Sequence, residues 1–485
     1  MNPKIYAGLF NRFAPYREAL ISGEVQLQAE VERIIQLIHE KSHLNAYLEV
    51  FEEEARIQAD SIAQKLKNGN AGQLAGMIIG IKDNMCLRGH RVSAGSKILE
   101  HFESLFTATA VQRLLAEDAI IIGRLNCDEF AMGSSNENSA YGPTLNPLNE
   151  NCVPGGSSGA SAAALAAGLC HASLGSDTGG SIRQPAAFTG LIGLKPTYGR
   201  ISRHGLIAYA SSFDQIGPFS NSIEDIALLL QIMAGPDEFD STASTQAVPA
   251  YSKSLKNKSK KYKIALPKSF VQLPGLDPYS KSHLYEILEA LKNEGHHIEE
   301  VDFELLEYVV PVYYLITTAE ASSNLARFDG VHYGFRAPNA DSLENIHKWS
   351  RTLGFGKEVQ RRILLGTFVL SSGFYDAYYA KAQKARRLIL EQVQSILGRF
   401  DFIIGPTAPH EAFELGRKDA DPTVMYLEDI YTVLANITGL PAISIPTALG
   451  PHNLPLGTQI MARSFEEGEL LAFSQEVLNI FNIKK

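Results

Sequence analysis

Two clusters of serine and glycine, at residues 155–161 and 177–181, are the part of the sequence best suited to chemistry. An alanine-rich stretch without Asp, Glu, Lys or Arg separates them. Glycine lets backbone N–H groups crowd around a reacting oxygen, and serine supplies hydroxyls for nucleophilic attack or proton transfer. The two clusters together therefore predict an active site built on hydroxyl groups.

The second cluster has the surroundings of an oxyanion-binding loop. A predicted strand at 172–175 precedes it, and a predicted helix with Pro185 in its first turn starts at Ser181. Helix capping by Ser181 is the structural alternative, but capping alone does not require two preceding glycines. The backbone N–H groups that could form a donor nest for a tetrahedral oxyanion are those of Thr178, Gly179, Gly180 and Ser181.

A lysine follows one of the predicted strands. The apolar run at 76–81 ends at Lys82, which would place the ammonium where a buried strand reaches the mouth of a pocket. Burial and nearby positive dipoles lower the pKa of an ammonium, and only the neutral amine can accept a proton from a hydroxyl. Lys82 is therefore a candidate base, and a solvated lysine at a strand end is the alternative.

The first cluster also matches the G-x-S-x-G pattern of a nucleophile elbow at residues 155–159. An elbow needs a preceding strand, a following helix, and a downstream acid and histidine. A helix over 162–167 is plausible, but 151–154 is a poor strand that contains a proline. The available histidines have no distinctive neighbourhood: His204, His332, His410 and His452. The elbow is thus the less favoured interpretation.

Apolar periodicity around these clusters predicts an α/β fold with strands and helices in alternation. Residues from about 17 to 67 have helical spacing. Strands are expected at 77–81, 119–122, 172–174, 191–194, 263–266, 298–303, 402–404 and 442–445. Helices are expected at 108–117, 161–167, 280–293 and 467–481.

The pattern favours one continuous domain over residues 1–485, without an internal repeat. Within this single domain we expect four segments: an N-terminal helical segment (1–70), a core with the serine clusters (71–240), a polar lysine-rich connection (241–262) and a second half (263–485). The lysines of the connection lack interleaved aromatic residues, which favours a solvated linker over an RNA-binding patch.

Composition limits the class of protein further. The 485 residues include 44 Lys and Arg and 53 Asp and Glu, which gives a net charge of −9. The whole chain therefore lacks the positive charge that favours binding of nucleic acid phosphates. The 4 cysteines match neither a metal knuckle nor a disulfide scaffold. No long apolar run is present, so we expect a cytoplasmic protein without a membrane segment.

The segment from Gly155 through Ser181 and on to 193–197 closely resembles the amidase signature family, whose members hydrolyse or transfer amides with a Ser–Ser–Lys triad. The resemblance implies a central mixed β-sheet covered on both faces by helices. It also implies that Ser181 is the acylated nucleophile, Ser157 the bridging serine after a cis peptide bond, and Lys82 the base. The two serines are 24 residues apart, as in the family. One departure is visible, because Ala160 stands where the family usually has glycine.

Further segments, at 128–134, 320–325 and 370–379, resemble the family's subgroup of tRNA-dependent amidotransferase subunits. The resemblance implies that glutamine is bound by Tyr313, Arg362 and Asp429. Physical reasoning agrees, because glutamine is a zwitterion that needs a guanidinium for its carboxylate and a carboxylate for its ammonium. Arg361 is the alternative to Arg362.

The same resemblance implies a heterotrimer with B and C subunits. Ammonia from glutamine would pass to the B subunit, where ATP and Mg²⁺ activate the carboxyl of Glu-tRNA(Gln), Asp-tRNA(Asn) or both, while this chain needs no metal or cofactor. The misacylated tRNA would be bound mainly by the partner, which suits the acidic charge of this chain. The alternatives are a stand-alone amidase acting on small amides and a non-enzymatic scaffold subunit.

Overall fold

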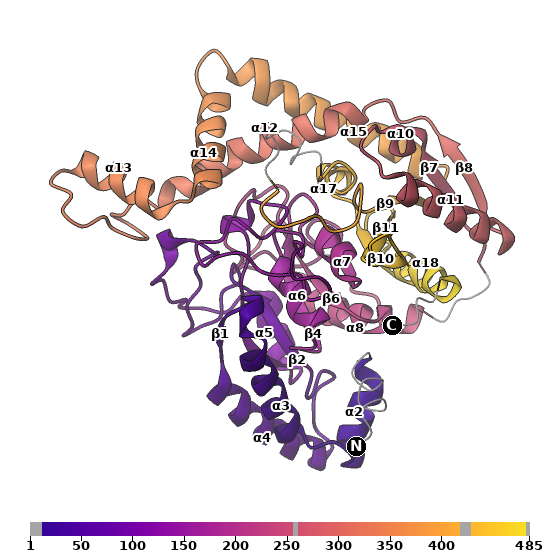
Figure 1. Cartoon of the computed structure of the whole chain (residues 1–485), viewed down its shortest axis with the longest axis horizontal. Helices are drawn as coiled ribbons and strands as arrows, with labels where there is room; N and C mark the ends of the chain where they lie inside the picture. The colour runs from indigo at the N-terminus through magenta and orange to yellow at the C-terminus, as the bar shows by residue number, and fades with distance from the viewer. Residues whose placement is uncertain (1–11, 256–259, 418–427, 482–485) are drawn as a thin grey trace.

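One mixed β-sheet of 11 strands forms the centre of the molecule, and helices flank it (Figure 1). The computed structural model describes residues 12–255, 260–417 and 428–481. The strand order is β1-β3-β2-β4-β6-β5-β10-β11-β9-β7-β8. The α/β class with a mixed central sheet, predicted from the sequence, is confirmed.

The strands are β1 (Tyr47–Val50), β2 (Ile78–Lys82), β3 (Ile120–Leu125), β4 (Ala172–Asp177), β5 (Ile192–Lys195), β6 (Gln215–Ser220), β7 (Lys263–Pro267), β8 (His297–Val301), β9 (Phe402–Pro406), β10 (Ala442–Leu449) and β11 (Pro455–Met461). Strand β2 pairs in parallel with both β3 and β4, whereas β10 pairs antiparallel with β5 and β11. Each strand predicted from an apolar run is present, but β1, β6 and β11 were not predicted.

The N-terminal segment departs from its predicted helical character in one place. Helices α2 (Phe13–Ser22), α3 (Leu27–Glu40) and α4 (Glu52–Asn68) form as the spacing indicates, but β1 lies between α3 and α4. The prediction of a wholly helical segment is therefore wrong at 47–50. All four residues of β1 are half-buried, so the strand has no alternating pattern, and its antiparallel pairing with the distant β3 decides its conformation.

The remaining helices are α5 (Thr109–Ala116), α6 (Gly159–Ala166), α7 (Arg183–Thr189), α8 (Ile223–Met233), α9 (Tyr251–Ser254), α10 (Lys268–Gln272), α11 (Pro278–Asn293), α12 (Leu306–Asn324), α13 (Leu343–Gly354), α14 (Lys357–Leu370), α15 (Lys381–Leu397), α17 (Val433–Thr438) and α18 (Glu467–Ile480). A π-helix, η5 (Tyr375–Ala380), leads into α15. Helices α5, α6, α11 and α18 match the predicted ones closely.

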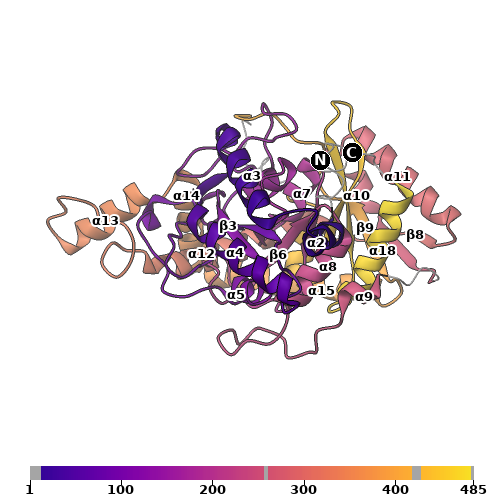
Figure 2. The same cartoon turned by 90° about the horizontal axis from the view of Figure 1, so that it is seen from below.

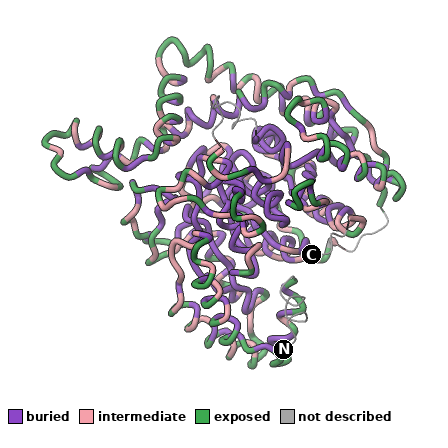
Figure 3. Tube along the Cα trace, in the orientation of Figure 1, coloured by how far each residue is buried: buried purple, intermediate pink, exposed green. Residues whose placement is uncertain are grey.

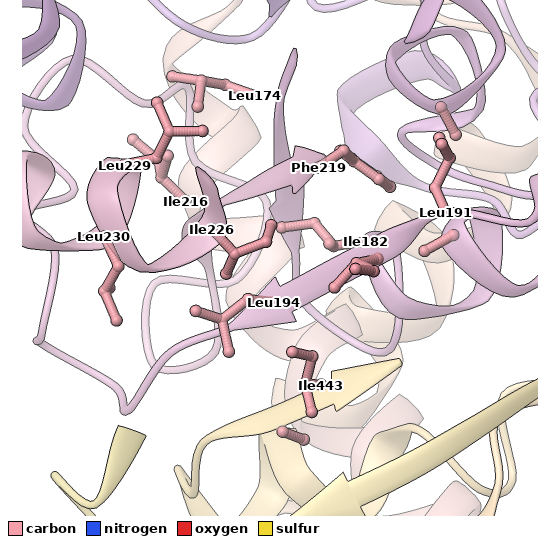
Figure 4. Packing of buried hydrophobic residues seen from close by; sticks show 14 of the residues in the cluster. Leu174, Ile182, Leu191, Leu194, Ile216, Phe219, Ile226, Leu229, Leu230 and Ile443 are labelled. Carbon is pink, nitrogen blue, oxygen red and sulfur yellow. The ribbon is translucent and has the colours of Figure 1, made fainter. Parts of the chain in front are cut away.

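The core continues across the two halves of the chain. In Figure 4, Leu194 of β5 lies beside Ile443 of β10, and both side chains are fully buried. Because β5 and β10 are paired, the serine-bearing half and the second half share one sheet. The site can therefore draw rigidly held residues from both halves.

An arm formed by α13 and α14 projects from this body, at the upper left of Figure 1 and the left end of Figure 2. Figure 3 shows that the arm is largely exposed, while the centre of the molecule is buried. Among the described residues, no helix has the length and apolar character needed to cross a membrane.

Candidate active site

Lys82 is fully buried at the carboxyl end of β2 and is surrounded by hydroxyl groups. Its Nζ atom lies 2.7 Å from Ser157 Oγ, 2.9 Å from Ser158 Oγ and 2.9 Å from Ser176 Oγ. Three oxygens match the three N–H bonds of an ammonium. When the lysine loses its proton, one of these hydroxyls can instead donate to the nitrogen lone pair. The arrangement therefore accommodates both protonation states.

Burial lowers the pKa of Lys82 to about 8, although nearby acidic groups, including Asp128 and Asp177, act in the opposite direction. All five residues of β2 are buried between β3 and β4, which explains why the lysine cannot reach water. About a tenth of the lysine is thus neutral at pH 7 and half at pH 8, so the base form is accessible. Sequence reasoning missed Ser158 and Ser176, although Ser158 belongs to the first cluster and Ser176 directly precedes the second.

Ser157 lies in a tightly held loop before α6. The peptide bond between Gly156 and Ser157 is cis, as the family resemblance implies. The Gly156 N–H donates to Gln184 Oε1 at 3.0 Å, and the Ser157 carbonyl accepts from the Asp128 N–H at 3.2 Å. These backbone contacts hold the Ser157 hydroxyl against Lys82.

The surroundings of an α/β-hydrolase elbow are not found here. Residues 145–158, all of them described, contain no strand beyond a single bridge at Cys152. The candidate histidines have other partners: His204 contacts Thr109, His332 contacts Asp329, His410 contacts Glu428, and His452 contacts Glu411. The G-x-S-x-G match is therefore not a nucleophile elbow.

Ser181 lies just before α7. Its exposed fraction is 7%, whereas Lys82 and Ser157 are fully buried. The Ser158 N–H donates to the Ser181 carbonyl at 3.2 Å, so the two serine loops meet through their backbones. No hydrogen bond joins the Ser181 hydroxyl to Ser157 or to another group in the described part of the chain. The structure thus joins the lysine to Ser157 directly and leaves the Ser181 hydroxyl open.

A buried ion pair shapes the Ser181 loop. The Asp177 carboxylate accepts from the Gly180 N–H at 2.9 Å, the Ile182 N–H at 3.2 Å and Arg183 Nη2 at 3.0 Å. Burial alone would raise the pKa of Asp177, but the charge and hydrogen bonds of Arg183 lower it to about 2. Arg183 also donates to the Thr432 carbonyl at 2.7 Å, which ties the loop to the second half of the chain.

Because of this ion pair, the set of backbone N–H donors predicted for the oxyanion is smaller than expected. The Gly180 N–H already donates to Asp177, so it is not free to bind an oxyanion. The N–H groups of Thr178, Gly179 and Ser181 have no acceptor among the described residues and remain the possible donors. Both glycines are needed for space: a Cβ at Gly179 would lie 2.6 Å from the Tyr313 hydroxyl, and one at Gly180 would lie 2.2 Å from Thr432 Oγ1.

Three further predicted residues come from α12, α14 and the segment before α17. Tyr313 is buried, with its hydroxyl beside Gly179. Arg362 is held by Tyr209 Oη at 2.8 Å and Glu358 Oε1 at 2.8 Å, and its guanidinium lies 5.2 Å from the centre of the Tyr314 ring. The Tyr314 hydroxyl in turn donates to Asp429 at 3.4 Å. Tyr314 therefore lies between the cation and the carboxylate.

Asp429 has an unusual environment for an acid. It is buried, and the Ser134 hydroxyl lies 3.0 Å and 2.9 Å from its two oxygens. Burial raises its pKa to about 7, while Ser134 and the charge of Arg362 limit the rise. An ammonium group placed beside Asp429 would restore its charged form.

The neighbouring Arg361 differs from Arg362. The Arg361 side chain is 56% exposed and pairs with Glu358, whereas the Arg362 side chain is 6% exposed and faces the buried tyrosines. The geometry favours Arg362 as the cation of the site. Sequence periodicity could not separate these adjacent residues, because both lie on one helix with charged neighbours.

The fold and this cluster define a class of protein. The amidase family model matches residues 29–471. The chain therefore belongs to the amidase signature family.

Individual relatives show which members of the family this chain is similar to. The chain is 48% identical, over 96% of its length and 98% of the relative, to the A subunit of the glutamyl-tRNA(Gln) amidotransferase of Chlorobium phaeobacteroides. It is 51% identical to the protein of the same name from Bacillus velezensis, over 88% of this chain and 87% of that one. The crystal structure of the Thermotoga maritima protein of this name is similar, with a TM-score of 0.77 and 37% identity over 94% of this chain and 92% of that one.

Proposed function

We propose that the chain is the glutamine-hydrolysing subunit of a tRNA-dependent amidotransferase, which converts Glu-tRNA(Gln), Asp-tRNA(Asn) or both to the amide form. The observation that carries the proposal is the Lys82–Ser157 contact beside the open Ser181 hydroxyl. Asp429 is linked to the same loop by the Thr432 hydroxyl, which contacts the Gly179 and Asp429 carbonyls, and to Arg362 by Tyr314. A cation and a carboxylate next to an acyl-transfer site suit an α-amino acid amide. The relatives named as the A subunit of the glutamyl-tRNA(Gln) amidotransferase, which match most of this chain, support this choice of substrate.

In the first half of the reaction, neutral Lys82 accepts the Ser157 proton while Ser157 accepts the Ser181 proton. The Ser181 oxygen then attacks the side-chain amide carbon of glutamine. Free N–H groups of Thr178, Gly179 and Ser181 would stabilise the resulting oxyanion, with about 3–4 kcal/mol at stake for each donor. Collapse breaks the C–N bond, and the departing nitrogen takes its proton from Ser157, which Lys82 reprotonates.

In the second half, water attacks the glutamyl ester on Ser181. Its proton passes to Ser157 and Lys82, and collapse of the second oxyanion returns a proton to the Ser181 oxygen. Glutamate leaves, so one glutamine and one water give one glutamate and one ammonia. The Lys82 amine ends each half of the reaction in the state in which it began.

We further propose that the protein works in the cytoplasm as a heterotrimer with B and C subunits, which bind the misacylated tRNA and use ATP and Mg²⁺. The net charge of −9 favours a tRNA site on another chain. The outer face of α14 and η5 exposes an apolar cluster, as expected of a surface that contacts other proteins. Its exposed members are Leu364 (70%), Phe368 (44%), Phe374 (40%), Tyr375 (46%) and Tyr378 (39%).

Purification of the full chain from its native host by gentle lysis tests this proposal. We expect two further protein chains and tRNA to co-purify, and we expect glutamine-dependent ammonia release that Ser181→Ala abolishes. Rapid turnover of simple aliphatic amides by the chain alone would instead identify a stand-alone amidase. A fully active complex that contains Ser181→Ala would identify a scaffold subunit.

A further inference from the structure

Glu129 is a buried carboxylate to which the proposed reaction assigns no part. It lies in η3 (Glu129–Ala131) and is 2% exposed. Its oxygens accept hydrogen bonds from the Ser96 hydroxyl and, at 2.8 Å, from the Gly356 N–H. It forms no ion pair within the described residues, and burial raises its pKa to about 7. A buried acid without a cation is unfavourable in itself, so its position calls for a reason.

The Gly356 N–H belongs to the N-terminus of α14. Gly356 is the N-cap of this helix. As a glycine it has no side chain that could accept a hydrogen bond from the N–H groups of the first turn. Glu129, 227 residues away in sequence, accepts the N–H of the cap residue itself and places an acidic group at the positive end of the helix. A Cβ at Gly356 would lie 2.4 Å from Glu129 Oε2, so an alanine there would displace the carboxylate from this contact.

Helix α14 carries Arg362, less than two turns after Gly356. Ser96 adds a second tie to the same junction, because its hydroxyl lies 3.2 Å from the Gly354 carbonyl. The body of the molecule thus fixes the start of α14 through Glu129 and Ser96. A shift of α14 along its axis would carry the Arg362 guanidinium with it.

The segment that holds Glu129 also reaches the other charged group of the site. Within residues 128–134, the Asp128 N–H donates to the Ser157 carbonyl at 3.2 Å, and the Ser134 hydroxyl contacts both oxygens of Asp429 at 3.0 and 2.9 Å. One short segment therefore links the Ser157 loop, Asp429 and the helix of Arg362.

We propose that Glu129 is a positioning residue for substrate recognition, which holds Arg362 at the separation from Asp429 that the carboxylate and ammonium of a free α-amino acid require. This inference rests on the proposed function, since the substrate is taken to be glutamine. It predicts that loss of the Glu129 contact weakens glutamine binding and leaves the chemistry at Ser181 nearly intact.

Kinetics of glutamine hydrolysis test the inference, measured on the full chain together with the chains that co-purify with it. We expect Glu129→Ala to raise KM for glutamine at least tenfold and to lower kcat less than threefold. Glu129→Gln should restore KM to within threefold of the wild type, because its amide oxygen still accepts the Gly356 N–H. Gly356→Ala approaches the same contact from the helix, with ordinary backbone angles, and should raise KM as Glu129→Ala does.

Two variants provide matched controls. Glu467→Ala removes another buried carboxylate that accepts a distant backbone N–H, that of Thr197 at 2.9 Å, and Gly275→Ala adds a methyl where no heavy atom lies within 4 Å. Both should keep the wild-type KM. An unchanged KM in Glu129→Ala and Gly356→Ala, or an equal rise in Glu467→Ala, would overturn the inference. If the wild type releases no ammonia from glutamine, the proposed function itself fails.

Discussion

Lys82 Nζ lies 2.7 Å from Ser157 Oγ, and both residues are excluded from water. Their contact sets the conditions under which the reaction can start, because the lysine must lose its proton inside the core before it can accept one. The same burial that makes the ammonium unfavourable supplies the base.

The first prediction concerns pH. With the pKa of Lys82 lowered to about 8 by burial, the active neutral form grows as the pH rises through that value. We expect kcat/KM for glutamine to increase about tenfold per pH unit between pH 7 and pH 8 and to level off above pH 8. A pH-rate profile checks this. Lys82→Arg should be inactive at every pH, because a guanidinium stays charged; measurable activity in this variant would contradict a lysine base.

The second prediction concerns the ionisation of the Asp429 carboxyl group. Its pKa, raised to about 7 by burial, means that the carboxylate which would bind the substrate ammonium is lost as the pH falls below 7. In the same profile the slope of log kcat/KM should approach two below pH 7. Asp429→Asn should remove this steeper limb and raise KM. If the slope stays near one in the wild type, Asp429 does not bind the substrate in its charged form.

The assignment of Ser181 as nucleophile predicts where the acyl group resides. Rapid acid quench of the enzyme with glutamine, followed by peptide mass spectrometry, should find a glutamyl ester on Ser181. Ser181→Ala should show no adduct. Ser157→Ala should lower kcat by at least a hundredfold, because the relay to Lys82 is broken, and any adduct that forms should still be at 181. An adduct on Ser157 would reverse the two roles.

The two adjacent arginines of α14 form a matched pair for mutation. Arg362→Met removes a buried guanidinium beside the site, and we expect KM for glutamine to rise about 10–100-fold, as for the loss of a hydrogen bond to a charged group worth about 1.5–3 kcal/mol. Arg361→Met changes an exposed side chain and should alter KM less than twofold. Steady-state kinetics of the two variants decide between them; equal effects would argue against a substrate contact at Arg362.

The Asp177–Arg183 ion pair predicts a stability change. Asp177→Ala leaves Arg183 buried without its counter-ion and frees the Ser181 loop, so we expect a loss of about 3–5 kcal/mol in the free energy of unfolding. Urea denaturation followed by circular dichroism measures it. Arg387→Ala, which breaks the exposed pair with Glu391, should leave the midpoint almost unchanged. A similarly small effect of Asp177→Ala would show that the loop does not depend on this pair.

Much of the fold was predictable because the signals are local. Strands β2 and β3 begin with runs of isoleucine, and α5 and α11 have the apolar spacing of amphipathic helices. Strands β1, β6 and β11 escaped prediction. Strand β1 has no alternation, and both β6 and β11 contain glycine and proline, so their ladder partners decide their conformation.

For the site, the sequence by itself determined the chemical groups: a lysine at a strand end, two serines in glycine-rich loops, and a cation and an acid for a zwitterion. Only the tertiary structure decided how they work. It surrounds Lys82 with Ser158 and Ser176, removes the Gly180 N–H from the donor set, and buries Arg362 while it leaves Arg361 exposed. The physical reason is that burial and long-range hydrogen bonds set these properties. The Ser134–Asp429 contact, for example, joins residues 295 apart, and no local pattern encodes it.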